Sequence, residues 1–74
     1  MTEKVYRIRQ AVWDRLSEKH QEYHEAEIAA HEMQNYQDAD ILEKRVDTIR
    51  KALVFCFSEN QDEFKFALDQ AMTE

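Results

Sequence analysis

The absence of glycine and proline from all 74 residues is the strongest constraint on the fold of this chain. At average usage of about 7% glycine and 5% proline, a chain of this length would carry roughly nine of these residues. Glycine supplies the positive φ of tight turns, and proline kinks or ends helices. Phosphate-binding loops, nucleophile elbows and dinucleotide-binding turns need glycine where the backbone approaches the ligand. The composition therefore favours an all-α protein and disfavours these enzyme classes.

Apolar residues recur at three- and four-residue steps in three segments of the chain, as they do in amphipathic helices. The first helix is expected from about residue 2 to residue 34. Asn35 is the expected break, because asparagine tolerates the left-handed conformation and also caps a following helix. The second helix is expected to run to about Phe57. Asn60 and Glu63 have the spacing of a capping box, which predicts a short third helix at the C-terminus.

The charges are arranged in blocks along the chain, within a net charge of −6. Residues 21–40 hold six acidic residues and no Lys or Arg, whereas residues 41–53 hold four basic residues against two acidic ones. A chain reversal near Asn35 would place position 44 opposite about position 27 and position 51 opposite about position 20, so that the two blocks face each other. The sequence therefore predicts an antiparallel hairpin formed by the long first helix and the second helix.

The third helix is expected to return along the first third of the first helix. In the same register, the acidic segment 59–69 would lie against Lys4, Arg7 and Arg9. No linker divides the chain, so residues 1–74 are expected to form a single all-α domain. A core of this size is marginal, and small scaffolds often gain stability by self-association. A dimeric helical bundle is therefore the second arrangement that the sequence allows.

Aromatic and histidine residues outside the main apolar stripes are the candidate partner-binding residues. A three-helix fold of this size cannot bury all of its aromatic side chains, and an excess of exposed aromatic residues marks an interface. The candidate set is Tyr6, Trp13, His20, His24, His31, Phe55 and Phe66. This set predicts a small non-enzymatic protein-binding module, expected to be a homodimer, that regulates or inhibits a partner protein by occupying its surface.

Three alternatives remain open at this point. The acidic face consists of Glu22, Glu25, Glu27 and Glu32. If left uncovered, this face would imitate a row of phosphates and inhibit a nucleic-acid-binding protein. His20, His24 and Glu27 follow one another at intervals of four and three residues, which permits a metal site without specifying one, so no metal and no cofactor are expected. The last alternative is purely structural self-association.

Other features of the composition limit the function further. Three short helices leave little room for the concave, partly dry pocket that catalysis needs, so no enzymatic activity is expected. The acidic net charge opposes direct nucleic-acid binding. Cys56, the lone cysteine, lies in an apolar run and is expected to be a small buried side chain. No apolar run approaches the roughly 20 residues of a membrane span, so no membrane partner and a cytoplasmic location are expected.

Overall fold

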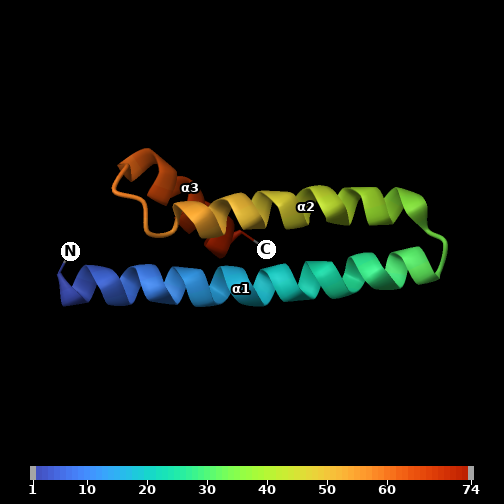
Figure 1. The fold of residues 1–74 in the computed structure, drawn as a ribbon, viewed down its shortest axis with the longest axis horizontal. Coiled ribbons are helices and arrows are strands. Elements are labelled where there is room, and N and C mark those ends of the chain that lie inside the picture. The colour runs from blue at the N-terminus through green and yellow to red at the C-terminus, as the bar shows by residue number, and fades with distance from the viewer. Residues whose placement is uncertain (1, 74) are drawn as a thin grey trace.

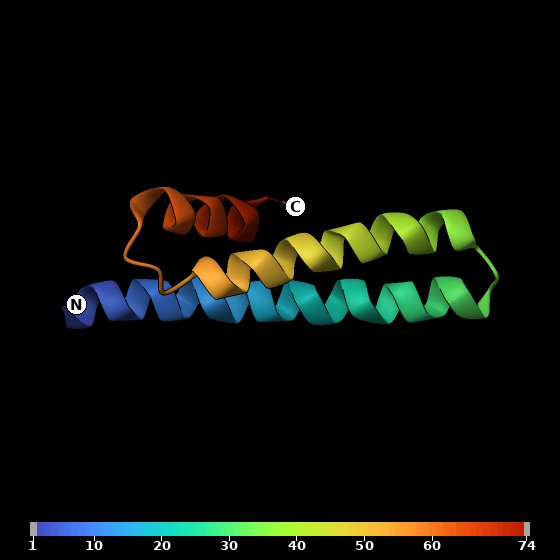
Figure 2. The same ribbon diagram turned by 45° about the horizontal axis from the view of Figure 1, so that its top comes forward.

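The computed structural model describes residues 2–73, which form the helices α1 (Glu3–Glu32), α2 (Tyr36–Phe55) and α3 (Gln61–Met72). Helices α1 and α2 lie side by side as an antiparallel hairpin (Figure 1). Helix α3 packs against one side of this hairpin, over the half that holds the N-terminus of α1 and the C-terminus of α2 (Figure 2). The all-α expectation is confirmed for the described residues. The molecule is elongated, with extents of 47 × 18 × 17 Å.

The turn between α1 and α2 reverses the chain without glycine. The sequence predicted that Asn35 would be the left-handed residue of this turn. The left-handed residue is instead Gln34, one position earlier, with a φ of 59°. The Asn35 amide donates to the Ala30 carbonyl oxygen at 2.8 Å and closes the C-terminal turn of α1 in a Schellman motif. The Asn35 side chain then accepts from the Asp38 amide and caps α2. The expected capping role of Asn35 is confirmed, and a glutamine takes the left-handed conformation that the sequence predicted for Asn35.

The connection between α2 and α3 is held by a hydrogen-bonded N-cap. Asn60 caps α3, because its side-chain oxygen accepts from the Asp62 and Glu63 amides at 2.9 and 3.2 Å. The Glu63 carboxylate accepts from the Ser58 hydroxyl at 2.6 Å, and the same hydroxyl accepts from the Asn60 amide. The Ser58 hydroxyl therefore bridges Asn60 and Glu63, the two members of the expected capping box, which do not bond through the Glu63 carboxylate directly. Helix α2 ends at Phe55, two residues before the expected end.

The core lies in the half of the hairpin that α3 covers, and all three helices contribute to it. Its buried members are Val12, Leu16, Ile49, Ala52, Cys56, Ala67 and Ala71. The expected burial of Cys56 is confirmed, since this residue is 0% exposed. Toward the α1–α2 turn, burial is limited to small and β-branched residues, which are Ala30, Ala39 and Val46. The two halves of the hairpin are therefore packed by different means.

The charged blocks do not pair across the helices as the sequence suggested. Each ion pair recorded between residues 2 and 73 joins side chains three or four positions apart on one helix. Arg7, expected opposite the acidic segment 59–69, instead pairs with Glu3. The hairpin register is close to the expected one, because Arg50 Nε donates to His20 Nε2 at 3.2 Å. The predicted register of the hairpin is therefore close to the observed one. The prediction that ion pairs between the helices set this register is wrong for the described residues.

Candidate protein-binding site

Two rows of side chains with seven-residue spacing lie next to each other on the surface of the hairpin. Tyr6, Trp13 and His20 follow one another at seven-residue steps on α1, and a seven-residue step corresponds to nearly two full turns. Arg50 on α2 and Phe57, two residues beyond the end of α2, are also seven residues apart, with Val54 between them. We name these six residues the aromatic face.

Contacts at both ends fix how the two rows face each other. The rings of Tyr6 and Phe57 lie 5.8 Å apart, centroid to centroid, at one end. At the other end, His20 accepts the hydrogen bond from Arg50. Trp13 lies midway between Tyr6 and His20 on its helix, so the antiparallel register places it opposite the part of α2 that carries Val54. The aromatic face therefore runs along both helices, with contacts between its two rows at each end.

The apolar members of this strip are exposed to an unusual degree. Trp13 is 40% exposed, Tyr6 52% and Val54 76%. Phe57 is also exposed, although its ring contacts that of Tyr6. Scattered single apolar residues are normal on protein surfaces, whereas a contiguous group marks a surface that contacts another molecule. The strip combines the three aromatic residue types and the arginine that are enriched in protein interfaces.

Arg9 holds the segment that carries Phe57 against α1. Its Nη1 atom donates to the carbonyl oxygens of Cys56 and Ser58 at 3.1 and 2.6 Å, on either side of Phe57. The guanidinium also lies 4.3 Å from the ring centroid of Phe64 on α3, in cation–π geometry. Arg9 therefore joins α1 to both following segments and fixes the backbone that places Phe57 beside Tyr6.

The other aromatic candidates lie away from this strip. Phe55 and Phe66 pack edge to face with ring centroids 6.0 Å apart, and both are partly buried against the core where α2 meets α3. Lys51 covers this pair, with its Nζ atom within 6 Å of both ring centroids. Phe55 and Phe66 therefore pack against each other where α2 meets α3, and they are not part of the aromatic face.

The remaining histidines extend along α1 toward the turn. The His24 ring stacks on that of His20 at 6.1 Å, and the His31 ring lies 6.1 Å from that of Tyr36 at the turn. Only His20 of the three histidines therefore belongs to the aromatic face. The sequence placed Val54, like the aromatic candidates, outside the main apolar stripes, but it assigned Phe57 to the apolar stripe of the second helix. The seven-residue spacing of Phe57 and Arg50, combined with the hairpin register, would have identified Phe57 as a surface residue.

The acidic candidates divide into two positions on α1. Glu22, Glu25 and Glu32 are exposed, whereas the Glu27 side chain is only 17% exposed and lies 3.8 Å from His24 Nδ1. Between residues 2 and 73, no group of three or more His, Cys, Asp and Glu side chains is arranged to hold a metal ion. The proposed acidic face is therefore a surface of three carboxylates, with the fourth directed elsewhere.

Comparisons with known proteins identify no relative: no family model, curated protein or solved structure matches this chain. Among the described residues, no helix combines the length and the apolar character needed to cross a membrane. The function is therefore argued from the geometry of the aromatic face and from the charges around it.

Proposed function

We propose that this chain is a small non-enzymatic protein-binding module that forms a homodimer through the aromatic face and acts by occupying the surface of a partner protein. The observation that carries the proposal is the exposure of Tyr6, Trp13, Val54 and Phe57 along α1 and the C-terminal end of α2, with the rings of Tyr6 and Phe57 in contact. Apolar side chains on this strip gain free energy when a second surface removes them from water.

A second copy of the chain suits this strip for a geometric reason. Two antiparallel helices with side chains at seven-residue spacing offer the surface that four-helix bundles pack against one another. A two-fold axis through the strip would bring two hairpins together, with the same residues contributed by each copy. Helix α3 packs on one side of each hairpin (Figure 2), and Lys19, which contacts α3, projects about 120° from Trp13 around α1, so α3 would remain outside the bundle.

The test is the solution mass of the chain, measured by light scattering over a wide concentration range. We expect a dimer for the natural sequence and at least a tenfold weaker dimer for Trp13→Ala, because central aromatic residues contribute about 2 kcal/mol or more to interfaces. Tyr36→Ala is the matched control, since Tyr36 is 64% exposed but lies at the turn. Circular dichroism must show that both variants keep their helices.

Two outcomes would count against the proposal. A monomeric natural chain at every concentration would refute the homodimer. Dissociation constants that are equal for Trp13→Ala and the natural chain would place the interface elsewhere, even if the dimer exists.

A second candidate function rests on the exposed carboxylates of α1. Glu22, Glu25 and Glu32 form no ion pair with any residue in the part of the chain that the structure describes. We propose that these carboxylates could instead meet a basic groove on a nucleic-acid-binding protein, in place of phosphates. The triple glutamine variant of these residues should then lose partner capture while keeping the dimer, and Trp13→Ala should show the opposite behaviour.

A further inference from the structure

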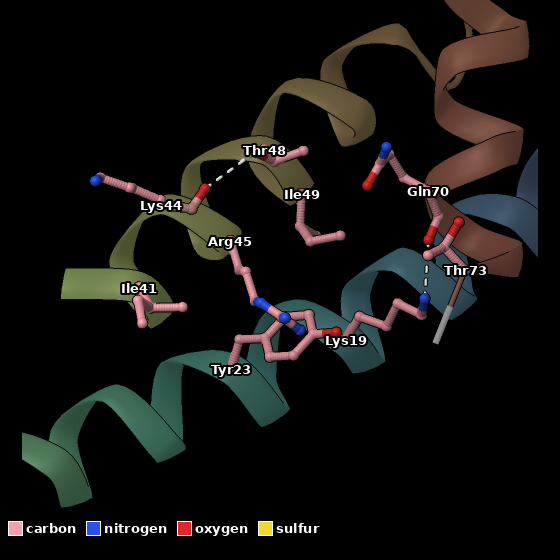
Figure 3. Close-up of a pocket in the computed structure, with 9 residues that line it drawn as sticks. All are labelled: Lys19, Tyr23, Ile41, Lys44, Arg45, Thr48, Ile49, Gln70 and Thr73. Atoms are coloured by element: carbon pink, nitrogen blue, oxygen red, sulfur yellow. Dashed lines mark hydrogen bonds between the residues drawn. The ribbon is translucent and has the colours of Figure 1, made fainter. Parts of the chain in front are cut away.

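The side of the hairpin on which α3 packs holds a groove that reaches the C-terminal end of α3. Beyond the C-terminal end of α3, the space between α1 and α2 continues as a groove of about 400 Å³ (Figure 3). Tyr23, Ile41 and Ile49 give it an apolar lining. Its volume falls within the range of about 300 to 1,000 Å³ that is usual for small-molecule sites.

All of the charged side chains that line the groove are basic. Lys19 from α1 and Lys44 and Arg45 from α2 line it, and no carboxylate does so within residues 2–73. This concentration of positive charge occurs in a chain of net charge −6. A cleft lined by charges of one sign raises the local concentration of ions of the opposite sign. The groove is therefore suited to an anion.

Lys19 is buried, and no carboxylate within residues 2–73 pairs with it. Its residue is 3% exposed, and its Nζ atom donates to the Gln70 carbonyl oxygen at 2.9 Å at the end of α3. This carbonyl is the one acceptor that the described residues offer to the ammonium, which has three N–H groups to donate. A buried cation is costly unless it is paired, so Lys19 gains from an anion at the groove.

Arg45 lies beside the same space with its guanidinium unpaired. It lies over the Tyr23 ring, 5.7 Å from the centroid, and forms no ion pair within the described part of the chain. Lys44 differs, because it already pairs with Asp40 at 3.2 Å on the exposed surface of α2. Figure 3 shows the Arg45 guanidinium at the Tyr23 ring, whereas the Lys19 side chain extends toward Gln70 at the end of α3. A guanidinium in this position can hold a carboxylate through two parallel hydrogen bonds.

We propose that this groove binds a small amphipathic carboxylate, with its acid group at Arg45, its apolar body against Ile41 and Ile49, and Lys19 as a second positive charge of the lining. The apolar lining favours an organic acid over a bare inorganic anion, and the basic side chains favour an acid over a neutral apolar molecule. The site is independent of the aromatic face, because Trp13 and Lys19 are six residues apart and project about 120° apart around α1.

Octanoate is the probe, because it combines one carboxylate with a short alkyl chain. Amide chemical shifts of the full chain are followed by NMR during titration with octanoate, 1-octanol and inorganic phosphate. We expect octanoate to shift the amides of residues 19–23, 41–49 and 70–73, and to bind about tenfold more tightly than either control, since a charge-assisted hydrogen bond contributes roughly this much. Octanol binding as tight as octanoate, phosphate binding as tight as octanoate, or no shift at millimolar octanoate would overturn the proposal.

Variants locate the site. Arg45→Gln should weaken octanoate binding about tenfold. Arg7→Gln makes the same charge change at an exposed position of α1 outside the groove and should leave the affinity unchanged. Equal weakening in both variants would show that net charge alone attracts the acid and would refute the site. Trp13→Ala should bind octanoate normally, so that failure of the dimer and failure of the groove are observed separately.

Discussion

The half of the hairpin that α3 covers and the half that ends in the turn are stabilised in different ways. The covered half contains Leu16 and Ile49 in a core shared by three helices. The turn half buries only Ala30, Ala39 and Val46 between two helices. Two helices alone bury little apolar area, so the turn half depends on close packing of small residues and on its caps. The comparison shows that a short third helix can concentrate most of the stability at one end of a long hairpin.

The largest expected effect comes from opening the core of the covered half. Leu16→Ala removes a fully buried side chain and should lower the free energy of unfolding by about 2 to 5 kcal/mol, measured by urea denaturation. Ile28→Ala on the same helix is the control, because Ile28 is 46% exposed and should cost much less. Equal costs for the two variants would contradict the idea that stability is concentrated in the covered half.

Arg9 offers the next test, because it connects the covered half to α3. Arg9→Gln removes the donor to the carbonyl oxygens of Cys56 and Ser58 and should cost about 1 to 3 kcal/mol. Hydrogen exchange should accelerate most in α3 and little near the turn. Arg15→Gln loses only an exposed ion pair with Glu18 and should change stability by less than about 1 kcal/mol. Uniform acceleration along the chain would show that the two halves unfold as one unit.

Cys56 gives the covered half a pH dependence. Burial raises the pKa of the Cys56 thiol, and the nearby positive charge of Arg9 only partly offsets this effect. The folded protein therefore holds this proton more tightly than the unfolded chain does. The resulting stability is fully present below the ordinary thiol pKa of about 8.5 and is lost as the pH rises from there through the folded pKa.

Urea denaturation at pH 7 and pH 10 measures this loss, and Cys56→Ala serves as the control because it lacks the thiol. The natural chain should lose more stability between these pH values than the variant does, by about 1.4 kcal/mol for each unit by which the pKa is raised. If the free energy of unfolding changed equally with pH in the natural chain and in Cys56→Ala, Cys56 would not be the source of the pH dependence.

The smallest expected effect lies at the turn and has the opposite sign. Gln34→Gly should raise the free energy of unfolding by about 0.5 to 1 kcal/mol, because glycine adopts the left-handed conformation without the penalty that a side chain imposes. Gln37→Gly, which places glycine inside α2, should instead lower it by about 0.5 kcal/mol. Melting curves distinguish the two, and a stabilising Gln37→Gly would show that backbone strain at Gln34 is not the cause.

Local patterns made the helices and their caps predictable. The periodic apolar residues, Asn35 and Asn60 define the three helices to within about two residues, since a cap needs only its own neighbouring amides. The left-handed conformation of Gln34 was not predicted, because it depends on where the last hydrogen bond of α1 forms. Asn35 was predicted to be left-handed instead, since asparagine adopts this conformation more readily than glutamine.

Side-chain partners between helices were harder to predict, because each one competes with partners on its own helix. Glu3 lies one turn from Arg7 and pairs with it without any need for chain closure. Lys19 occupies a position in the apolar stripe of α1, and only the carbonyl oxygen of Gln70 at the end of α3 explains its burial. The docking of α3 likewise determines the placement of Phe55 and Phe66. The aromatic face was predicted in part, through Tyr6, Trp13 and His20.

The contacts that dock α3 also set an order of events during synthesis. The contact of Arg9 with Ser58 joins residues 49 positions apart, and the contact of Lys19 with Gln70 joins residues 51 positions apart. The hairpin can form from local contacts as soon as α2 has left the ribosome, whereas the Lys19 contact must wait for the end of α3. During that interval Leu16 and Ile49 remain uncovered on one side of the hairpin. The nascent chain thus carries two exposed apolar sides for a time, and completion of α3 covers Leu16 and Ile49 while the aromatic face stays exposed.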